Sequence, residues 1–127
     1  MSNSRILLLD SNIVMYFFKG DEKLLKLIEK KPVAINFMIE IELLSWPLLT
    51  SAHQNLLTNL VEDSYYFDYG SRIKVETINL KKIYRLKSAD AFIAATALVH
   101  NLTLISADKV FSKIDNLSLI SFIPSLS

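Results

Sequence analysis

A short apolar run near the start of the chain limits the folds that this sequence can adopt. Residues 6–9 are all aliphatic, which is typical of a strand buried on both faces of a parallel sheet. The run ends at Asp10, and an apolar helical pattern begins at Ile13. Ligands of open α/β sheets bind outside the carboxyl ends of the strands, so Asp10 lies where a site is expected. Asp10 or Ser11 could equally be the N-cap of the following helix.

The rest of the chain alternates strands with helices. Strands are predicted at residues 33–37, 102–105 and 117–122, and residues 65–69 are either a strand or a loop. Helices are predicted up to residue 19, over 22–31 after the cap Asp21, and over 38–46, 51–61, 72–87 and 89–99, with a helical turn at 109–113. Such alternation predicts parallel βαβ units, and therefore an α/β fold: a three-layer α/β/α sandwich with a central parallel sheet. With 127 residues, the chain is expected to be a single domain, 1–127.

The composition excludes several kinds of site. There are no cysteines, which removes disulfides, thiolate metal sites and cysteine nucleophiles. With two glycines in the chain, neither a P-loop nor a dinucleotide-binding fingerprint can form. No signal-peptide pattern or membrane-spanning stretch is present, so a soluble, cytoplasmic protein without membrane contact is expected. His53 and His100 fall at a helix start and a helix end, where structural roles are expected.

Four of the thirteen acidic residues are expected at the carboxyl-end edge of the sheet. They are Asp10, Glu42, Asp90 and Asp108. Asp90 could instead serve the positive end of a helix, and Asp108 could cap the turn that follows it. Clustered carboxylates repel one another and are costly to bury, and a hard divalent cation relieves both problems. Oxygen ligands favour Mg²⁺ or Mn²⁺ over zinc, so the acids predict a metal site that could activate water against a phosphodiester.

The net charge of +1 identifies no partner, but the basic residues are unevenly distributed. Within residues 72–87, a single acid, Glu76, accompanies six basic side chains: Arg72, Lys74, Lys81, Lys82, Arg85 and Lys87. This basic stripe is either a solvated helix face or a surface for a polyanion.

Four segments together resemble the successive motifs of PIN-domain proteins, in the right order and over the whole chain. They are LDSN at 9–12, ELLS at 42–45, LKSADAFIAATA at 86–97 and LISADKVF at 104–111. The similarity is closest to the VapC-like toxin ribonucleases of type II toxin–antitoxin modules. The motif around Asp90 is the most specific of the four.

The resemblance implies a PIN-like fold and a Mg²⁺- or Mn²⁺-dependent endoribonuclease. It implies an RNA substrate, a cognate antitoxin that inhibits the toxin by covering its groove, and a homodimer. Catalytic and metal-binding roles carry over to four carboxylates with a polar helper beside the first: Asp10, Glu42, Asp90 and Asp108, with Asn12 (or Ser11). The candidates for contact with RNA phosphates are the basic residues Lys81, Lys82, Arg85 and Lys87.

The sequence departs from the family pattern near the glutamate. The family often has Ser or Thr three residues before it, and here that residue is Ile39, so any hydrogen bond from that position to the site is lost. Glu40 is a rival carboxylate. Residues two apart lie about 200° apart around a helix, so Glu40 and Glu42 cannot both point inward. The match to Glu-Leu-Leu selects Glu42.

Two other functions stay open. A catalytically weak interaction module would use aromatic side chains such as Phe18, Trp46 and Tyr65 as an interface, and the absence of cleavage would identify it. A phospho-acceptor role for Asp10 is disfavoured, because such sites need a lysine after a later strand and have no use for Glu42.

Overall fold

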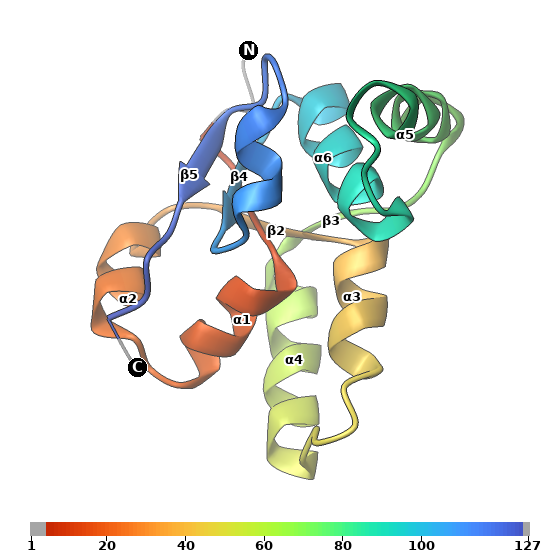
Figure 1. The fold of residues 1–127 in the computed structure, drawn as a ribbon. Helices are drawn as coiled ribbons and strands as arrows, with labels where there is room; N and C mark the ends of the chain where they lie inside the picture. Colours follow the sequence, from red (N-terminus) through yellow and green to blue (C-terminus); the bar gives the residue numbers. More distant parts are fainter. Residues whose placement is uncertain (1–4, 126–127) are drawn as a thin grey trace.

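A five-stranded parallel sheet forms the centre of the computed structural model, which describes residues 5–125 (Figure 1). The spatial order of the strands is β3-β2-β1-β4-β5, and all four neighbouring pairs are parallel. Their bounds are β1 Leu7–Leu9, β2 Val33–Asn36, β3 Tyr65–Phe67, β4 Thr103–Ser106 and β5 Leu119–Ser121. The predicted α/β/α sandwich is confirmed, and within the aromatic stretch at 65–69 a strand forms over residues 65–67.

Helices cover both faces of the sheet. Their bounds are α1 Ser11–Phe18, α2 Glu22–Ile28, α3 Phe37–Leu44, α4 Ser51–Asp63, α5 Ser71–Tyr84, α6 Ser88–His100 and the 3₁₀ helix η1 Lys109–Lys113. The chain runs outward from β1 through β2 to β3, then returns past β1 to β4 and β5. Right-handed crossovers in opposite directions place their helices on opposite faces. Figure 1 shows α5 and α6 together above the sheet and α1, α2 and α4 below it.

Two helices end three residues earlier than the sequence pattern predicts. Helix α2 stops at Ile28 rather than residue 31, because Lys30 adopts a left-handed conformation (φ 59°) and the next amide donates to the carbonyl of Ile28 at 3.1 Å. Helix α5 stops at Tyr84 rather than residue 87, because Arg85 is also left-handed (φ 55°). Side-chain periodicity carries no signal for these backbone turns.

A buried asparagine connects the end of β2 to α6. Asn36, fully buried at the end of β2, donates from Nδ2 to Thr96 Oγ1 at 3.0 Å. Its Oδ1 accepts the amide of Ile39 at 2.7 Å and so caps α3. One side chain therefore fixes the start of α3, which carries Glu42, against α6, which carries Asp90.

No helix in the part of the chain that the structure describes is both long enough and apolar enough to cross a membrane.

Candidate active site

Asp10 lies where the strand order reverses, between β1 and β4. It follows β1 directly and is only 6% exposed. Its Oδ1 accepts the backbone amide of Ser11 at 2.8 Å, which makes it the N-cap of α1. Its Oδ2 accepts the hydroxyl of Ser106, the last residue of β4, at 2.6 Å. In open α/β sheets this reversal point is where ligands bind.

The segment after β4 is held to the segment after β1. The Ser106 hydroxyl accepts the amide of Asp108 at 3.0 Å while it donates to Asp10. The amide of Ala107 donates to Asn12 Oδ1 at 3.2 Å, and Asn12 Nδ2 lies 3.5 Å from Asp10 Oδ2. Asp108 is exposed and caps η1 through the amide of Val110. Asp10, Asn12 and Asp108 are thus brought together. Asp10 and Asp108 are also the N-caps of α1 and η1, so the capping roles that the sequence allowed are observed as well.

The two glutamates of α3 point to different partners. Glu42 Oε1 lies 3.3 Å from the hydroxyl of Ser11, beside Asp10. Glu40 Oε1 accepts the phenol of Tyr66 at 2.7 Å, on the side of β3. Ile39 is fully buried and offers no side-chain donor, so Ser11 supplies the hydrogen bond that this chain makes to its glutamate.

Burial and mutual repulsion raise the pKa of three of these acids. The largest effect on the pKa of Asp10 is burial, which raises it. The hydrogen bonds from Ser106 and Ser11 lower this pKa, and the charges of Asp90 and Asp108 raise it. The pKa of Glu42 is raised by burial and then by Asp10. The pKa of Asp90, in the first turn of α6, is raised by burial and then by Asp108, while Lys87 lowers it. The four acids therefore share one electrostatic environment.

We call four side chains the acid cluster: Asp10, Glu42, Asp90 and Asp108. The ligand atoms that they could offer to a metal are all carboxylate oxygens, which Mg²⁺ and Mn²⁺ prefer. Burial is the main cause of the raised pKa of Asp10, Glu42 and Asp90, and repulsion among the acids adds to it, so the ionised forms are disfavoured. Among the described residues, however, no three acidic or histidine side chains already stand close enough together to hold an ion. A cation would have to draw these side chains inward.

The four basic candidates lie around the junction of α5 and α6. Lys81 and Lys82 are in the last turn of α5, and Lys81 Nζ donates to the Ser88 hydroxyl at 2.6 Å. Lys87 is the residue before α6 and is close enough to Asp90 to lower its pKa. All three are exposed, as is Arg85. Of the four, Lys87 is the one with a direct electrostatic link to the acid cluster.

Both histidines have aromatic surroundings. The ring of His53 stacks on Phe18 (centroids 5.9 Å apart) and on Trp46 (6.1 Å). The ring of His100 lies 4.5 Å from that of Phe67, and burial followed by the charge of Arg72 lowers its pKa. These contacts agree with the structural roles expected for them.

Ser106 is the residue that sequence analysis missed. It is 1% exposed and contacts Asp10 directly, but in the sequence it is one serine at the beginning of a predicted turn. The available signal was its position: a polar residue at the carboxyl end of a buried strand, as Asp10 is.

Comparisons with known proteins agree on one family. The family model of the PIN domain matches residues 7–117. Similar solved structures include a toxin–antitoxin complex from Klebsiella pneumoniae, with 26% identity and a TM-score of 0.77 over 90% of this chain and 95% of that one. VapBC2 from Rickettsia felis, bound to a DNA fragment from their promoter, has 21% identity and a TM-score of 0.75 over 91% and 97%. VapBC-1 from nontypeable Haemophilus influenzae has 23% identity and a TM-score of 0.72 over 91% and 96%. No curated protein matches the sequence significantly.

Proposed function

This chain belongs to the PIN-domain family, and on that premise we propose that it is a metal-dependent endoribonuclease acting as the toxin of a VapBC-type toxin–antitoxin pair. PIN domains are generally nucleases, which supports the hydrolytic activity. The similar solved structures are of toxin–antitoxin complexes, which supports the toxin role and a cognate antitoxin as the inhibiting partner. We further propose that the chain is a single domain, that it is cytoplasmic and that it forms a homodimer.

The observation that carries the proposal is the set of acids around the reversal point of the sheet. Asp10 is buried there; burial raises its pKa, and the charges of Asp90 and Asp108 raise that pKa further. The pKa of Glu42 is likewise raised by burial and then by the charge of Asp10. A protein maintains such repulsion at a cost in stability, and a bound divalent cation removes that cost. We assign the ion to Asp10, Glu42 and Asp90, with Asp108 completing the site or holding a second ion.

When bound, Mg²⁺ or Mn²⁺ would lower the pKa of water and neutralise charge that develops on the phosphodiester. The protein's own contribution is orientation. Ser106 holds Oδ2 of Asp10 and favours the ionised carboxylate. Asn12 bridges Asp10 and the backbone after β4, and Ser11 positions Glu42. The flanking phosphates would be bound by basic side chains around α5 and α6: Lys81, Lys82, Arg85 and Lys87.

Substitution of Asp10 by Asn tests the proposal. Asn is as good an N-cap as Asp, so Asp10→Asn keeps the start of α1 while it removes the charge. We expect the variant to lose RNA cleavage in Mg²⁺ or Mn²⁺ and to lose Mn²⁺ binding by calorimetry, with an unchanged circular dichroism spectrum. The matched control is Asp63→Asn, which changes an exposed acid at the end of α4. This variant should keep both RNA cleavage and Mn²⁺ binding. Cleavage retained by purified Asp10→Asn would overturn this mechanism.

A second candidate, a catalytically weak PIN-fold interaction module, is favoured by one observation. Among residues 5–125, no three potential ligands stand ready to hold an ion. If the wild-type protein forms a metal-independent complex with a small helical partner and cleaves no RNA at any metal concentration, this second function replaces the first.

A further inference from the structure

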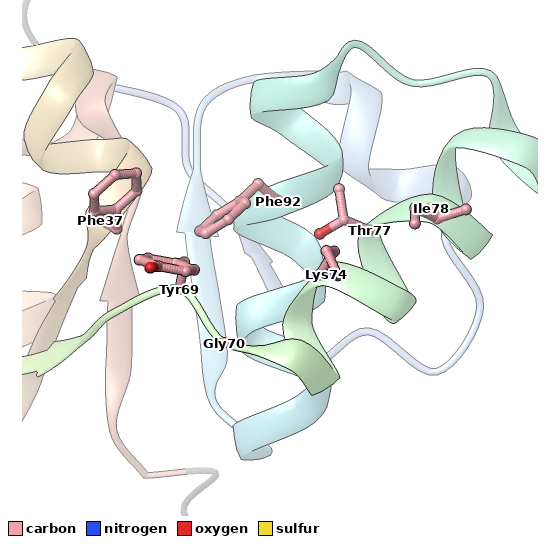
Figure 2. Close-up of a pocket in the computed structure, with 7 residues that line it drawn as sticks. All are labelled: Phe37, Tyr69, Gly70, Lys74, Thr77, Ile78 and Phe92. Carbon is pink, nitrogen blue, oxygen red and sulfur yellow. The ribbon is translucent and has the colours of Figure 1, made fainter.

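An aromatic pocket of about 420 Å³ opens between the start of α3, the connection from β3 to α5, and helices α5 and α6 (Figure 2). Its walls include Phe37, Tyr69 and Phe92, and Lys74 lies along it. We propose that this pocket binds an unpaired base of a single-stranded RNA, a few nucleotides from the phosphodiester at the acid cluster. The proposal deepens the proposed function and rests on it.

Three aromatic rings pack against one another in the wall of the pocket, and one of them is largely exposed. Phe37 packs edge-on against Tyr69, with centroids 5.6 Å apart and planes at 60°, and it lies 6.1 Å from Phe92. Figure 2 shows the three rings gathered around one opening. Tyr69 is 68% exposed, so much of its ring is open to solvent. Exposed aromatic faces of this kind stack on splayed bases, and they do so with any base because every base has a π-face.

The charge beside the rings favours a nucleotide over an apolar side chain of a protein. Lys74 is exposed, and its aliphatic stem lines the pocket, so its ammonium group is free to reach solvent at the rim. A base in the pocket carries a phosphate with it, and a lysine at the rim complements that charge.

The pocket and the acid cluster share two helices. Phe37 begins α3, and Glu42 follows five residues later, about 7.5 Å along the helix axis. Phe92 and Asp90 lie in the first turns of α6, on different sides of a cylinder about 10 Å wide. A strand with one phosphate at the acids therefore reaches the pocket within a few nucleotides. Only an unpaired strand can place a base there, so the pocket would direct cleavage to loops and single strands.

Binding of RNA without metal tests the pocket independently of cleavage. A fluorescein-labelled single-stranded oligonucleotide is titrated with the full chain in EDTA and followed by anisotropy. Tyr69→Ala should weaken binding by roughly 5- to 150-fold, the range for the loss of one base–aromatic stack. Tyr69→Phe keeps the ring and should bind as the wild type does. The control is Tyr65→Ala, which removes a 56% exposed tyrosine on β3 that does not line this pocket.

Lys74→Gln provides a second measurement. Loss of one phosphate contact should reduce the slope of log K against log salt by about 0.7, whereas Tyr69→Ala should leave the slope unchanged. Wild-type affinity in Tyr69→Ala would overturn the proposal. It would also be overturned if Tyr69→Ala lowers the molar mass in light scattering without changing RNA affinity, because the pocket is then a contact between two copies of the chain.

The two proposals fail in distinguishable ways. If Asp10→Asn abolishes cleavage while Tyr69→Ala binds RNA normally, the nuclease stands and the base pocket is wrong. If the wild type cleaves no RNA but binding in EDTA depends on the ring of Tyr69, the base pocket stands and the proposed chemistry is wrong.

Discussion

Asp10 serves the fold and the candidate site through different oxygens. Oδ1 caps α1, and Oδ2 accepts the hydroxyl of Ser106 across the reversal point of the sheet. The two interpretations that the sequence left open, helix cap and site acid, are therefore compatible in one side chain. Ser106 in turn accepts the amide of Asp108, so a single hydroxyl connects the two acids.

Replacement of Ser106 by Ala should weaken the cation site without dismantling the fold. The hydrogen bond from Ser106 lowers the pKa of Asp10, so its loss should raise that pKa further. Protons then compete better with the cation, and Mn²⁺ binding by calorimetry should weaken more at pH 6 than at pH 8. The stability cost of one lost buried hydrogen bond is about 1–2 kcal/mol.

The matched control for this substitution is Ser121→Ala. Ser121 is the exposed register partner of Ser106 on β5, so the same change is made in the neighbouring strand away from Asp10. Equal Mn²⁺ affinities for both variants at both pH values would show that Ser106 does not act on the site.

At the scale of elements, local rules predicted most of the secondary structure. Gly20 (φ 76°) and Asn101 (φ 54°) end α1 and α6 in the left-handed conformation, as their residue types indicate. The early ends of α2 and α5 were missed because Lys30 and Arg85 adopt that conformation without the usual residue type.

Part of the candidate site could be predicted from the sequence, because the order of strands and helices places some of its residues. Acids that follow strands can be placed on a sheet edge from topology alone, and Asp10 and Asp108 lie there. The pairing of Glu40 with Tyr66 and the role of Ser106 depend on tertiary contacts, which periodicity does not encode. The metal-binding roles of the acids stay predictions.

The segment after β5 is attached to the start of α2 by one buried acid. Asp21 is fully buried and caps α2 through the amide of Leu24 at 3.2 Å. It also accepts the amide and the hydroxyl of Ser125 at 2.8 and 2.7 Å. Asp21→Ala should therefore lower the free energy of unfolding by roughly 2–4 kcal/mol, measured by urea denaturation.

Asp21→Asn separates the two functions of this side chain. Asn can still cap α2 but cannot accept all the hydrogen bonds that a carboxylate does, so an intermediate loss is expected. If Asp21→Ala costs only about 1 kcal/mol, the typical value for a single helix cap, the attachment contributes nothing beyond that cap.

At the scale of the whole molecule, the acid cluster should make metal-free stability depend on pH. Folding raises the pKa of Asp10, Glu42 and Asp90, so the folded state binds protons more tightly than the unfolded chain. Their contribution is fully present below the unfolded pKa values, near pH 4, and is lost as pH rises through the raised values. The melting temperature in EDTA should accordingly fall as pH rises from about 4 towards neutrality.

Mn²⁺ should reverse this fall, because an ion that binds only the folded state adds about 2.7 kcal/mol at a hundred times its Kd. Asp90→Asn, in EDTA, should flatten the pH dependence and melt higher than the wild type near neutral pH. If the melting temperatures of the wild type and Asp90→Asn in EDTA depend on pH in the same way, this acid is not destabilised by its surroundings.

The central position of β1 determines when the site is completed during synthesis. The hydrogen-bond partner of Asp10, Ser106, lies 96 residues later in the chain. At translation rates of about 5–20 residues per second, that interval lasts about 5–20 s. Throughout it, the nascent polypeptide carries Asp10 without the complete strand β4. Under the proposed function, the ability to cut RNA arises only after β4 has been synthesised, and a shorter nascent chain is harmless to the messenger that encodes it.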